Sequence, residues 1–289
     1  MKYLKTQLKE LMLEEKKDKH QKDSFWATEA ETNQFDIYHR WMGTPETNPM
    51  TVETKLGLSV RTKVEEAFVD MLDKLGVLIK PEEGQHRVEM KREGVKVTGY
   101  IDAIIEEEKK QVPIEFKTSF GRYASNDLQQ GIVKTHYLKQ LAIYMDFLGV
   151  EKGYIIQANF LDSFLVEDIY QFTLVRDGDI FKCNNIEFNI QDIYKRWAEI
   201  YDKYIELKIE PESEYRYKYP IDELNWETIS PSKISKARTN KAVIGDWQAL
   251  YSSYKDLIIK QEGSSLGYTD EEIEKIKEAT KGYSTWNKK

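Results

Sequence analysis

The spacing of apolar residues along the chain predicts an alternation of helices and strands. Apolar residues recur every three or four positions in four stretches, which predicts helices over residues 2–22, 54–75, about 128–148 and 190–207. Alternating apolar and polar residues, or short apolar runs, predict strands over 86–90, 95–105, 112–118, 153–158 and 169–174. Gly76 follows the second helix as its C-terminal stop. Residues 24–52 show no clear period and are interpreted as irregular structure.

This order of elements indicates an α/β protein with a mixed central β-sheet flanked by helices. The chain has no internal repeat, no low-complexity tract and no clear linker, so we expect one domain with helical additions at both ends. The core is predicted over 54–208, after a helical or irregular extension over 1–53. The C-terminal extension over 209–289 is a candidate for contact with DNA or a partner protein. Its basic run at 233–241 suits phosphate contacts, although a solvated helix face explains the run at least as well.

Composition excludes several classes of protein. A chain of 289 residues with 40% hydrophobic and 32% charged residues is too apolar to be disordered and can bury a sizeable core. Cys183 is the one cysteine, which excludes an internal disulfide, a multi-cysteine zinc site and an iron–sulfur cluster. A net charge of −7 argues against a protein that coats DNA, but not against an enzyme with a local basic groove. Because no apolar run could span a membrane and the N-terminus is charged throughout, we expect a cytoplasmic protein without membrane contact.

Three reactive side chains fall on two consecutive strands. Asp102 lies on the strand face opposite the aliphatic residues, while Glu115 and Lys117 share a face because they are two positions apart. A short turn joins the two strands, so we expect them to pair and to bring the three side chains to one face of the sheet. Two carboxylates at that distance repel each other, and partial burial raises their pKa values.

A hard divalent cation would remove this conflict. Mg²⁺ takes oxygen ligands and is usually bound by one or two carboxylates together with substrate phosphates. It polarises a phosphoryl oxygen and lowers the pKa of a bound water, while Lys117 can orient that water or offset the charge of the phosphate. The three residues therefore suit hydrolysis of a phosphodiester bond. A Glu115–Lys117 ion pair on a solvated face is the simpler interpretation, and the apolar segment 112–116 argues against it.

At these residues the sequence resembles the PD-(D/E)xK nuclease superfamily. The matching segments are Gly-Tyr-Ile-Asp at 99–102 and Glu-Phe-Lys-Thr-Ser at 115–119. Downstream, Gln-Leu-Ala-Ile-Tyr at 140–144 is similar to the Gln-x-x-x-Tyr motif of the RecB-like branch, which includes helicase-coupled nucleases, CRISPR-associated nucleases and phage exonucleases. The resemblance covers residues 55–160 and implies a restriction-endonuclease-like core.

The resemblance also implies a role for each matching position. Asp102 and Glu115 would be metal ligands together with the backbone carbonyl of Phe116, and these two carboxylates would act in catalysis with Lys117. The ion would be Mg²⁺ or Mn²⁺. The subgroup of this branch that carries an iron–sulfur cluster needs four cysteines, so the resemblance implies no such cluster here.

Further positions complete the implied site. The helix before the first strand would add a Glu or His, and here Glu65 and Glu66 are the candidates; Glu65 lies nearer the apolar face of the helix and is preferred as a metal ligand. Gln140 and Tyr144, one turn apart, would contact DNA or the attacking water, although a helix flank with a buried tyrosine explains them too. The candidates for contact with the DNA strand are Thr118, Ser119, Arg122, Lys134 and Lys139.

The sequence therefore predicts a Mg²⁺- or Mn²⁺-dependent deoxyribonuclease. The resemblance favours an exonuclease in recombination, repair or phage DNA metabolism, with DNA as substrate and a helicase, recombinase or single-strand-binding protein as a candidate partner. Three alternatives stay open at this point. They are an inactive nuclease-fold module that binds DNA or a helicase, a nuclease that cuts RNA or structured DNA internally, and a structural assembly protein with an acidic surface.

Overall fold

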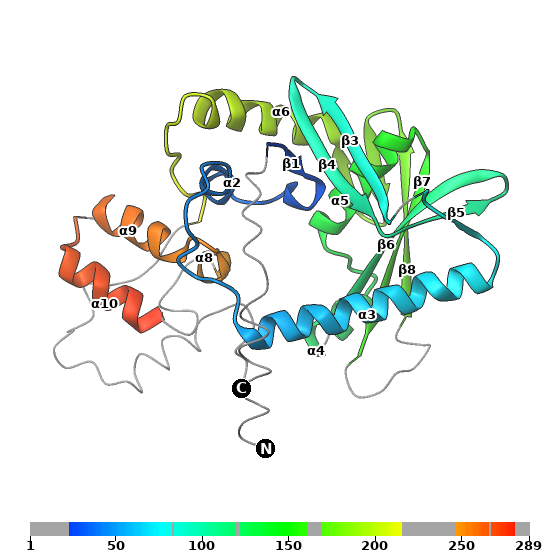
Figure 1. Ribbon diagram of the computed structural model, residues 1–289, viewed down its shortest axis with the longest axis horizontal. Helices are drawn as coiled ribbons and strands as arrows, with labels where there is room; N and C mark the ends of the chain where they lie inside the picture. Colours follow the sequence, from blue (N-terminus) through cyan, green and yellow to red (C-terminus); the bar gives the residue numbers. More distant parts are fainter. Residues whose placement is uncertain are drawn as a thin grey trace, which may run out of the picture. The chain divides into compact units, whose positions relative to one another are not determined.

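The computed structural model describes residues 23–82, 84–119, 122–160, 169–215, 247–265 and 267–280 (Figure 1). The predicted helix over 2–22 and the basic run at 233–241 lie outside these residues. The described residues divide into two compact units, of which the larger consists of 23–32 and the described part of 59–206, and the smaller of 33–58, 207–215, 247–265 and 267–280. The segment 23–32, which the sequence places in the N-terminal extension, therefore belongs to the unit that holds the predicted core.

A seven-stranded mixed sheet forms the centre of the larger unit and confirms the predicted α/β class. Its strands lie in the order β10, β9, β8, β7, β6, β5, β2. β6 and β7 are parallel, and the other neighbours are antiparallel. The bounds are β2 (Leu78–Ile79), β5 (Ala103–Glu107), β6 (Lys110–Ser119), β7 (Lys152–Asn159), β8 (Ile169–Asp177), β9 (Ile180–Cys183) and β10 (Ile186–Asn189).

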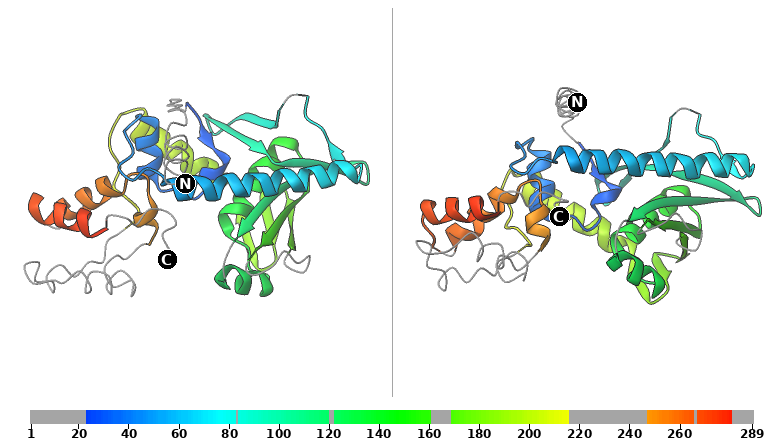
Figure 2. Two further views of the ribbon diagram at one scale, coloured as in Figure 1. Left: turned by 60° about the horizontal axis from the view of Figure 1, so that its bottom comes forward. Right: turned by 90° about the horizontal axis from the view of Figure 1, so that it is seen from below.

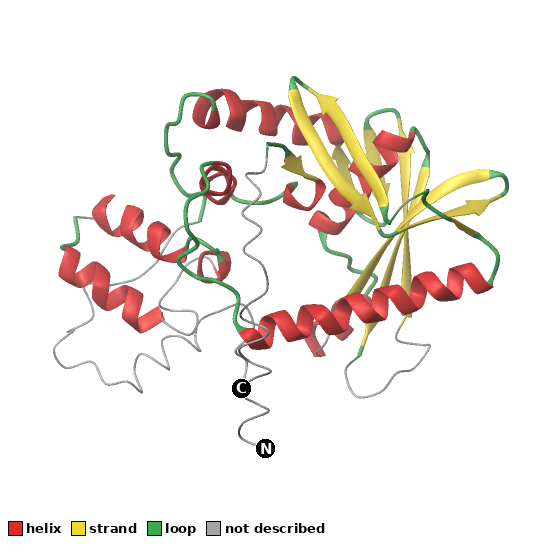
Figure 3. Ribbon diagram, viewed as in Figure 1, coloured by secondary structure: helices red, strands yellow, loops and turns green. Residues whose placement is uncertain are grey.

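A smaller sheet consists of β1 (Phe25–Trp26), β4 (Val95–Ile101) and β3 (His86–Arg92), in that order (Figure 3). The turn predicted between β3 and β4 is present, with positive φ angles of 46° at Glu93 and 82° at Gly94, as a tight two-residue hairpin turn requires. The single strand predicted over 95–105 is wrong. The chain leaves the small sheet after Ile101 and enters the large sheet at Ala103, so that Asp102 stands between the two.

The helices differ from the predicted ones mainly at their ends. α3 (Val52–Lys74) matches the predicted helix over 54–75, and Gly76 follows it with a φ of 72°. The helix predicted over about 128–148 begins later, as α5 (Thr135–Leu148). Residues 128 and 129 instead end a separate helix, α4 (Arg122–Gln129), and the turn between the two helices includes Gly131 with a φ of 71°. α6 (Ile190–Ile200) continues as a π-helical turn, η3 (Tyr201–Ile205), close to the predicted 190–207.

Part of the segment predicted to be irregular is helical. It forms a 3₁₀ turn, η1 (Ala27–Glu29), and α2 (Gln34–Trp41). Asn33 caps the N-terminus of α2, because its side-chain oxygen accepts a hydrogen bond from the backbone N–H of Phe35. In the smaller unit, Phe35 packs in a buried cluster with Ala249 of α8 (Trp247–Tyr251), Ile258 of α9 (Lys255–Ser265) and Tyr254 between these two helices. α10 (Asp270–Thr280) follows α9.

Two helices cover the two faces of the large sheet near β6. On one face, Phe68 of α3 stacks on Phe116 of β6, with ring centroids 5.2 Å apart and planes 12° apart. Figure 2 shows α3 lying along that side of the strands. Because side chains alternate along a strand, Glu115 and Lys117 point to the other face, where Glu115 accepts a hydrogen bond from Gln140 of α5. Glu115 and Lys117 are therefore placed between β6 and α5.

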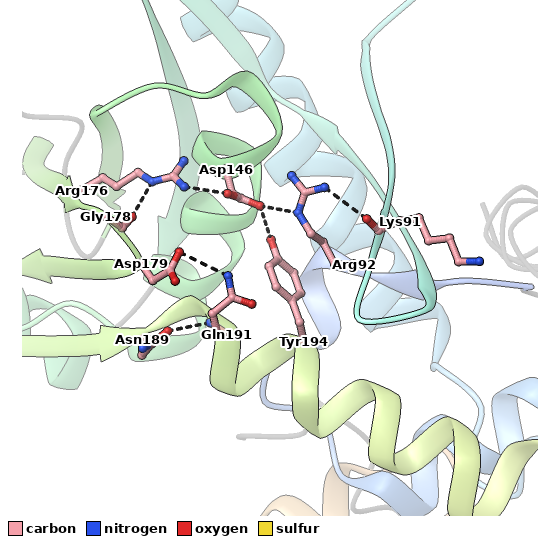
Figure 4. A network of polar contacts seen from close by, with 9 residues as sticks. All are labelled: Lys91, Arg92, Asp146, Arg176, Gly178, Asp179, Asn189, Gln191 and Tyr194. Atoms are coloured by element: carbon pink, nitrogen blue, oxygen red, sulfur yellow. Dashed lines mark hydrogen bonds and ion pairs between the residues drawn. The ribbon is translucent and has the colours of Figure 1, made fainter.

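A network of ion pairs fixes α5 in this position (Figure 4). The carboxylate of Asp146 on α5 accepts hydrogen bonds from Arg92 of β3 and Arg176 of β8, both at 2.9 Å, and from the hydroxyl of Tyr194 of α6 at 3.0 Å. The Asp146 side chain is 9% exposed, whereas those of Arg92 and Arg176 are 38% and 21% exposed, so the carboxylate is shielded and the guanidinium groups are partly solvated. One buried carboxylate thus ties α5 to both sheets and to α6.

No helix within the described part of the chain is long and apolar enough to cross a membrane.

Candidate active site

The structure brings Asp102, Glu115 and Lys117 together at the junction of the two sheets. The backbone N–H of Phe116 donates to the Asp102 carboxylate at 2.8 Å, and the Lys117 ammonium donates to one Glu115 oxygen, Oε1, at 2.5 Å. The geometry differs in one respect from a simple strand pair. The β5–β6 ladder begins at Ala103, so the Asp102 backbone takes part in neither ladder and its side chain is held by β6 instead.

Glu115 is the most deeply buried of these groups, with a side chain that is 2% exposed. Its Oε1 also accepts a hydrogen bond from the Gln140 amide at 2.7 Å, whereas its other oxygen, Oε2, is buried without a partner. Burial, together with the nearby Asp102 charge, raises the pKa of Glu115 to about 8, although Lys117 acts in the opposite direction. The site therefore contains a carboxylate oxygen that lacks a positive partner.

The charges of the site act on each other. Burial raises the pKa of Asp102, against the opposing effects of Lys117, of the hydrogen bond from Phe116 and of the Glu115 side chain. Burial alone would lower the pKa of Lys117, but the Glu115 and Asp102 carboxyl groups together outweigh it, so the pKa of Lys117 is raised. Lys117 thus remains an ammonium group and partly balances two acids.

Gln140 and Tyr144 of α5 complete the buried side of the site. The Gln140 amide donates to Glu115 and also to the Tyr144 hydroxyl at 3.0 Å, while its oxygen accepts from Lys117 at 3.4 Å. The Tyr144 ring rests against the backbone of β4, where a Cβ added to Gly99 would be 2.8 Å from Cε1 of Tyr144. The glycine of the Gly-Tyr-Ile-Asp segment is therefore needed here for close approach, because any side chain would displace the tyrosine.

α3 contributes one glutamate to the same region. Burial, followed by the Asp102 charge, raises the pKa of Glu65 to about 7, and Lys117 and Arg61 act against this. Glu66 instead is exposed and accepts a 2.6 Å ion-pair contact from Lys63 on the surface of the helix. Of the two candidates, the structure places Glu65 close enough to the site to interact with its charges.

The residues present suit a divalent cation. The Asp102 charge raises the pKa values of Glu65 and Glu115, and the Glu65 charge also raises that of Glu115. A cation would relieve this conflict, and Oε2 of Glu115, which accepts no hydrogen bond, is an available ligand atom. Within the described residues, no three His, Cys, Asp or Glu side chains already stand at the mutual distances of a formed metal centre. An ion would have to draw these carboxylates together. The ligand roles of Asp102, Glu115, Glu65 and the Phe116 carbonyl stay predictions.

The candidates for DNA contact are scattered. Thr118 is buried on the face of Phe116, opposite Lys117, and its hydroxyl has no partner. Ser119 lies on the Lys117 face and donates to the Asn159 side chain at 3.0 Å. Arg122 is the first residue of α4, and its side chain lies outside what the structure describes. Lys139 is paired with Glu31 at 2.8 Å, whereas Lys134 is exposed.

Two features of the site were missed by the sequence interpretation. Tyr137, one turn before Gln140 on α5, presents its ring to the Lys117 ammonium, with 5.0 Å between Nζ and the ring centroid. On β7, Gln157 and Asn159 pair in register with Lys117 and Ser119 and are buried beside them. The sequence contained a signal for both: Tyr137 shares the helix face of Gln140 and Tyr144, and two amides interrupt an otherwise apolar strand.

Comparisons with known proteins give distant likenesses in fold. No family model and no curated protein matches the chain. The solved structure of SSO0001 is 17% identical, with a TM-score of 0.40 over 70% of this chain and 84% of the other. The alkaline exonuclease LHK-Exo from Laribacter hongkongensis is 15% identical, with a TM-score of 0.41 over 65% of this chain and 90% of the other. Its complex with dAMP gives 15% identity and a TM-score of 0.45 over 66% and 92%.

Proposed function

We propose that this protein is a Mg²⁺- or Mn²⁺-dependent deoxyribonuclease that hydrolyses phosphodiester bonds. One observation carries the proposal. The buried Glu115 has one oxygen fixed by Lys117 and Gln140, while its other oxygen is buried without a partner beside Asp102. A structural ion pair would satisfy both oxygens, because an unpaired buried carboxylate oxygen is destabilising. A cation ligand needs one oxygen left free.

Each side chain has a distinct task in this proposal. Asp102, Glu115 and Glu65 would hold the ion, with the Phe116 carbonyl as a further ligand. The bound ion would polarise a phosphoryl oxygen and lower the pKa of a water molecule. Lys117, whose side chain is 20% exposed, can reach a phosphate from the site and offset its developing negative charge or orient the attacking water.

Gln140 and Tyr144 act on the groups around them. The Gln140 amide bonds to Glu115 and Lys117 at once, so it fixes the distance between the carboxylate and the ammonium group. The Tyr144 hydroxyl accepts from the same amide and keeps it oriented. This chain of hydrogen bonds positions the reactive groups before substrate arrives, which is what lowers the cost of reaching the transition state.

Finer features of the function are proposed from the sequence resemblance. They are exonucleolytic action, a role in recombination, repair or phage DNA metabolism, and a helicase, recombinase or single-strand-binding partner. Ser119 is the predicted DNA contact that lies on the Lys117 face, and Lys134 is exposed near the start of α5. We propose that these two residues contact the DNA strand.

A nuclease assay tests the proposal. End-labelled linear duplex, linear single strands and a closed circle are incubated with Mg²⁺, Mn²⁺ or EDTA and with wild type, Lys117→Ala or Lys182→Ala. Lys182, an exposed lysine of β9 paired with Glu187, is the matched control. We expect metal-dependent degradation of linear DNA, lowered about 10²–10⁴-fold by Lys117→Ala alone.

Each other outcome has a definite meaning. Equal cleavage by wild type and Lys117→Ala rejects the assignment of Lys117. Cutting of the closed circle, which has no ends, would show that the protein is an endonuclease and not an exonuclease. DNA binding without cleavage, combined with no Asp102-dependent Mg²⁺ binding in calorimetry, indicates an inactive module that binds DNA.

A further inference from the structure

Within the described residues, the ammonium group of Lys117 contacts a carboxylate on its own strand and two side chains of α5. Glu115 on the same strand accepts at 2.5 Å, Gln140 on α5 accepts at 3.4 Å, and the Tyr137 ring lies 5.0 Å away at the start of α5. The first two are hydrogen-bond acceptors. The third is an aromatic face, which attracts a cation through its quadrupole at this distance.

We propose that Tyr137 is a positioning residue for the reaction, whose ring holds the Lys117 ammonium group in place to meet the substrate phosphate. The inference rests on the proposed nuclease function. It adds a residue outside the Asp, Glu-x-Lys and Gln-x-x-x-Tyr positions, and it acts through Lys117 without touching the reacting atoms.

An aromatic face suits this task better than another polar group. Lys117 has three N–H donors, and Glu115 and Gln140 take two of them. A third acceptor would occupy the donor that a phosphate or water needs. The ring attracts the charge as a whole and leaves that donor available.

The aromatic ring of Tyr137 makes the contact with Lys117. This half-buried ring also packs edge-on against the ring of His136, with centroids 4.2 Å apart, and Lys117 is the residue of the proposed site that it meets. Lys134 lies 5.8 Å from the same ring centroid. Being exposed, it can leave the ring for a DNA phosphate, whereas Lys117 is held by its two acceptors.

Kinetics on a graded set of side chains tests the inference. We expect Tyr137→Phe to keep the wild-type kcat, and Tyr137→Leu to lower kcat about 2- to 30-fold with KM unchanged. Replacing Tyr137 by phenylalanines with one, two and three ring fluorines should lower kcat stepwise, because fluorine withdraws charge from the ring face at nearly constant size. Tyr204→Leu, at a half-buried tyrosine of η3, is the matched control and should leave kcat unchanged.

A second measurement does not depend on activity. With ¹³C-labelled lysine, the ε-methylene protons of Lys117, assigned by their absence in Lys117→Ala, should be shifted upfield by the ring in wild type and Tyr137→Phe. In Tyr137→Leu they should move to the ordinary lysine position. An unshifted signal in wild type would show that the ring does not lie over the ammonium group, and would overturn the inference even if the protein proved to be a nuclease.

The two proposals fail in different ways. A wild type without metal-dependent cleavage ends the nuclease proposal and the positioning role with it. An active wild type that needs Lys117, but whose kcat is the same across the fluorinated series, ends the positioning role alone.

Discussion

Replacing Glu115 by Gln should remove a loss of folding stability that the metal-free protein suffers at alkaline pH. The substitution keeps the size of the side chain and its contact with Gln140, but it removes the buried charge. The pKa of Glu115 lies at about 8 in the folded protein, against 4.5 for the ordinary side chain, chiefly because burial disfavours the charged form. At ~1.36 kcal/mol for each pKa unit, ionising Glu115 in the folded state costs on the order of 5 kcal/mol.

The direction of this pH dependence follows from which state, folded or unfolded, binds the proton more tightly. A carboxyl group with a raised pKa binds its proton more tightly when folded, so its contribution to stability is complete below pH 4.5 and is lost as the pH rises towards 8. In EDTA, the free energy of unfolding of wild type should therefore fall between pH 5 and pH 9 relative to that of Glu115→Gln. Above pH 8 the variant should be the more stable protein.

Urea unfolding followed by circular dichroism at pH 5, 7 and 9 measures this difference. Glu187→Gln is the control, because Glu187 is an exposed glutamate whose substitution should give curves parallel to wild type. Added Mg²⁺ should restore the stability of wild type at pH 9 and leave Glu115→Gln unchanged, since the ion binds the ionised carboxylate. Parallel pH dependences of wild type and Glu115→Gln in EDTA would refute the reasoning.

Three further substitutions test separate parts of the site and its support. Glu65→Gln should weaken Mg²⁺ binding in calorimetry at pH 8 at least tenfold, whereas Glu66→Gln should leave it unchanged. Asp146→Asn should lower the free energy of unfolding by about 3 kcal/mol in urea, because two arginines lose their buried partner. Gly99→Ala should destabilise the protein by about 1–3 kcal/mol and lower cleavage of linear DNA, because the new methyl group displaces the Tyr144 ring.

The local chemistry of the site could be predicted because it depends on the alternation along one strand. The face shared by Glu115 and Lys117 follows from their spacing of two, and the apolar face of Phe116 follows from the same rule. The spacing of four between Gln140 and Tyr144 likewise places both on one side of α5. Contacts within one element are fixed by the geometry of that element.

Breaks between elements were harder to predict, because the apolar pattern continues across them. The period of two runs through Asp102 without interruption, although the chain changes sheets there. Helical spacing similarly runs through the turn at Gly131 that separates α4 from α5. The β9–β10 hairpin was missed since its two strands have four residues each and are joined by a turn at Asn184 with a φ of 50°.

Contacts made across the fold left only a partial signal in the sequence. Tyr137 meets Lys117 because α5 packs on β6 at one particular rotation, and that rotation depends on the anchoring of Asp146 by residues from three other elements. The spacing along the chain places Tyr137 on the helix face of Gln140 and Tyr144, but it does not show that this face meets Lys117.

The position of Asp102 between two sheets has a mechanical consequence. An ion held by Asp102 and Glu115 would join the end of the β3–β4 hairpin to strand β6 and so connect the small sheet to the large one. Backbone amides of that hairpin should then exchange with deuterated solvent more slowly when the ion is bound. Binding of the ion would thus be detected in the exchange rates of the backbone amides of β3, a strand that carries none of the proposed ligands.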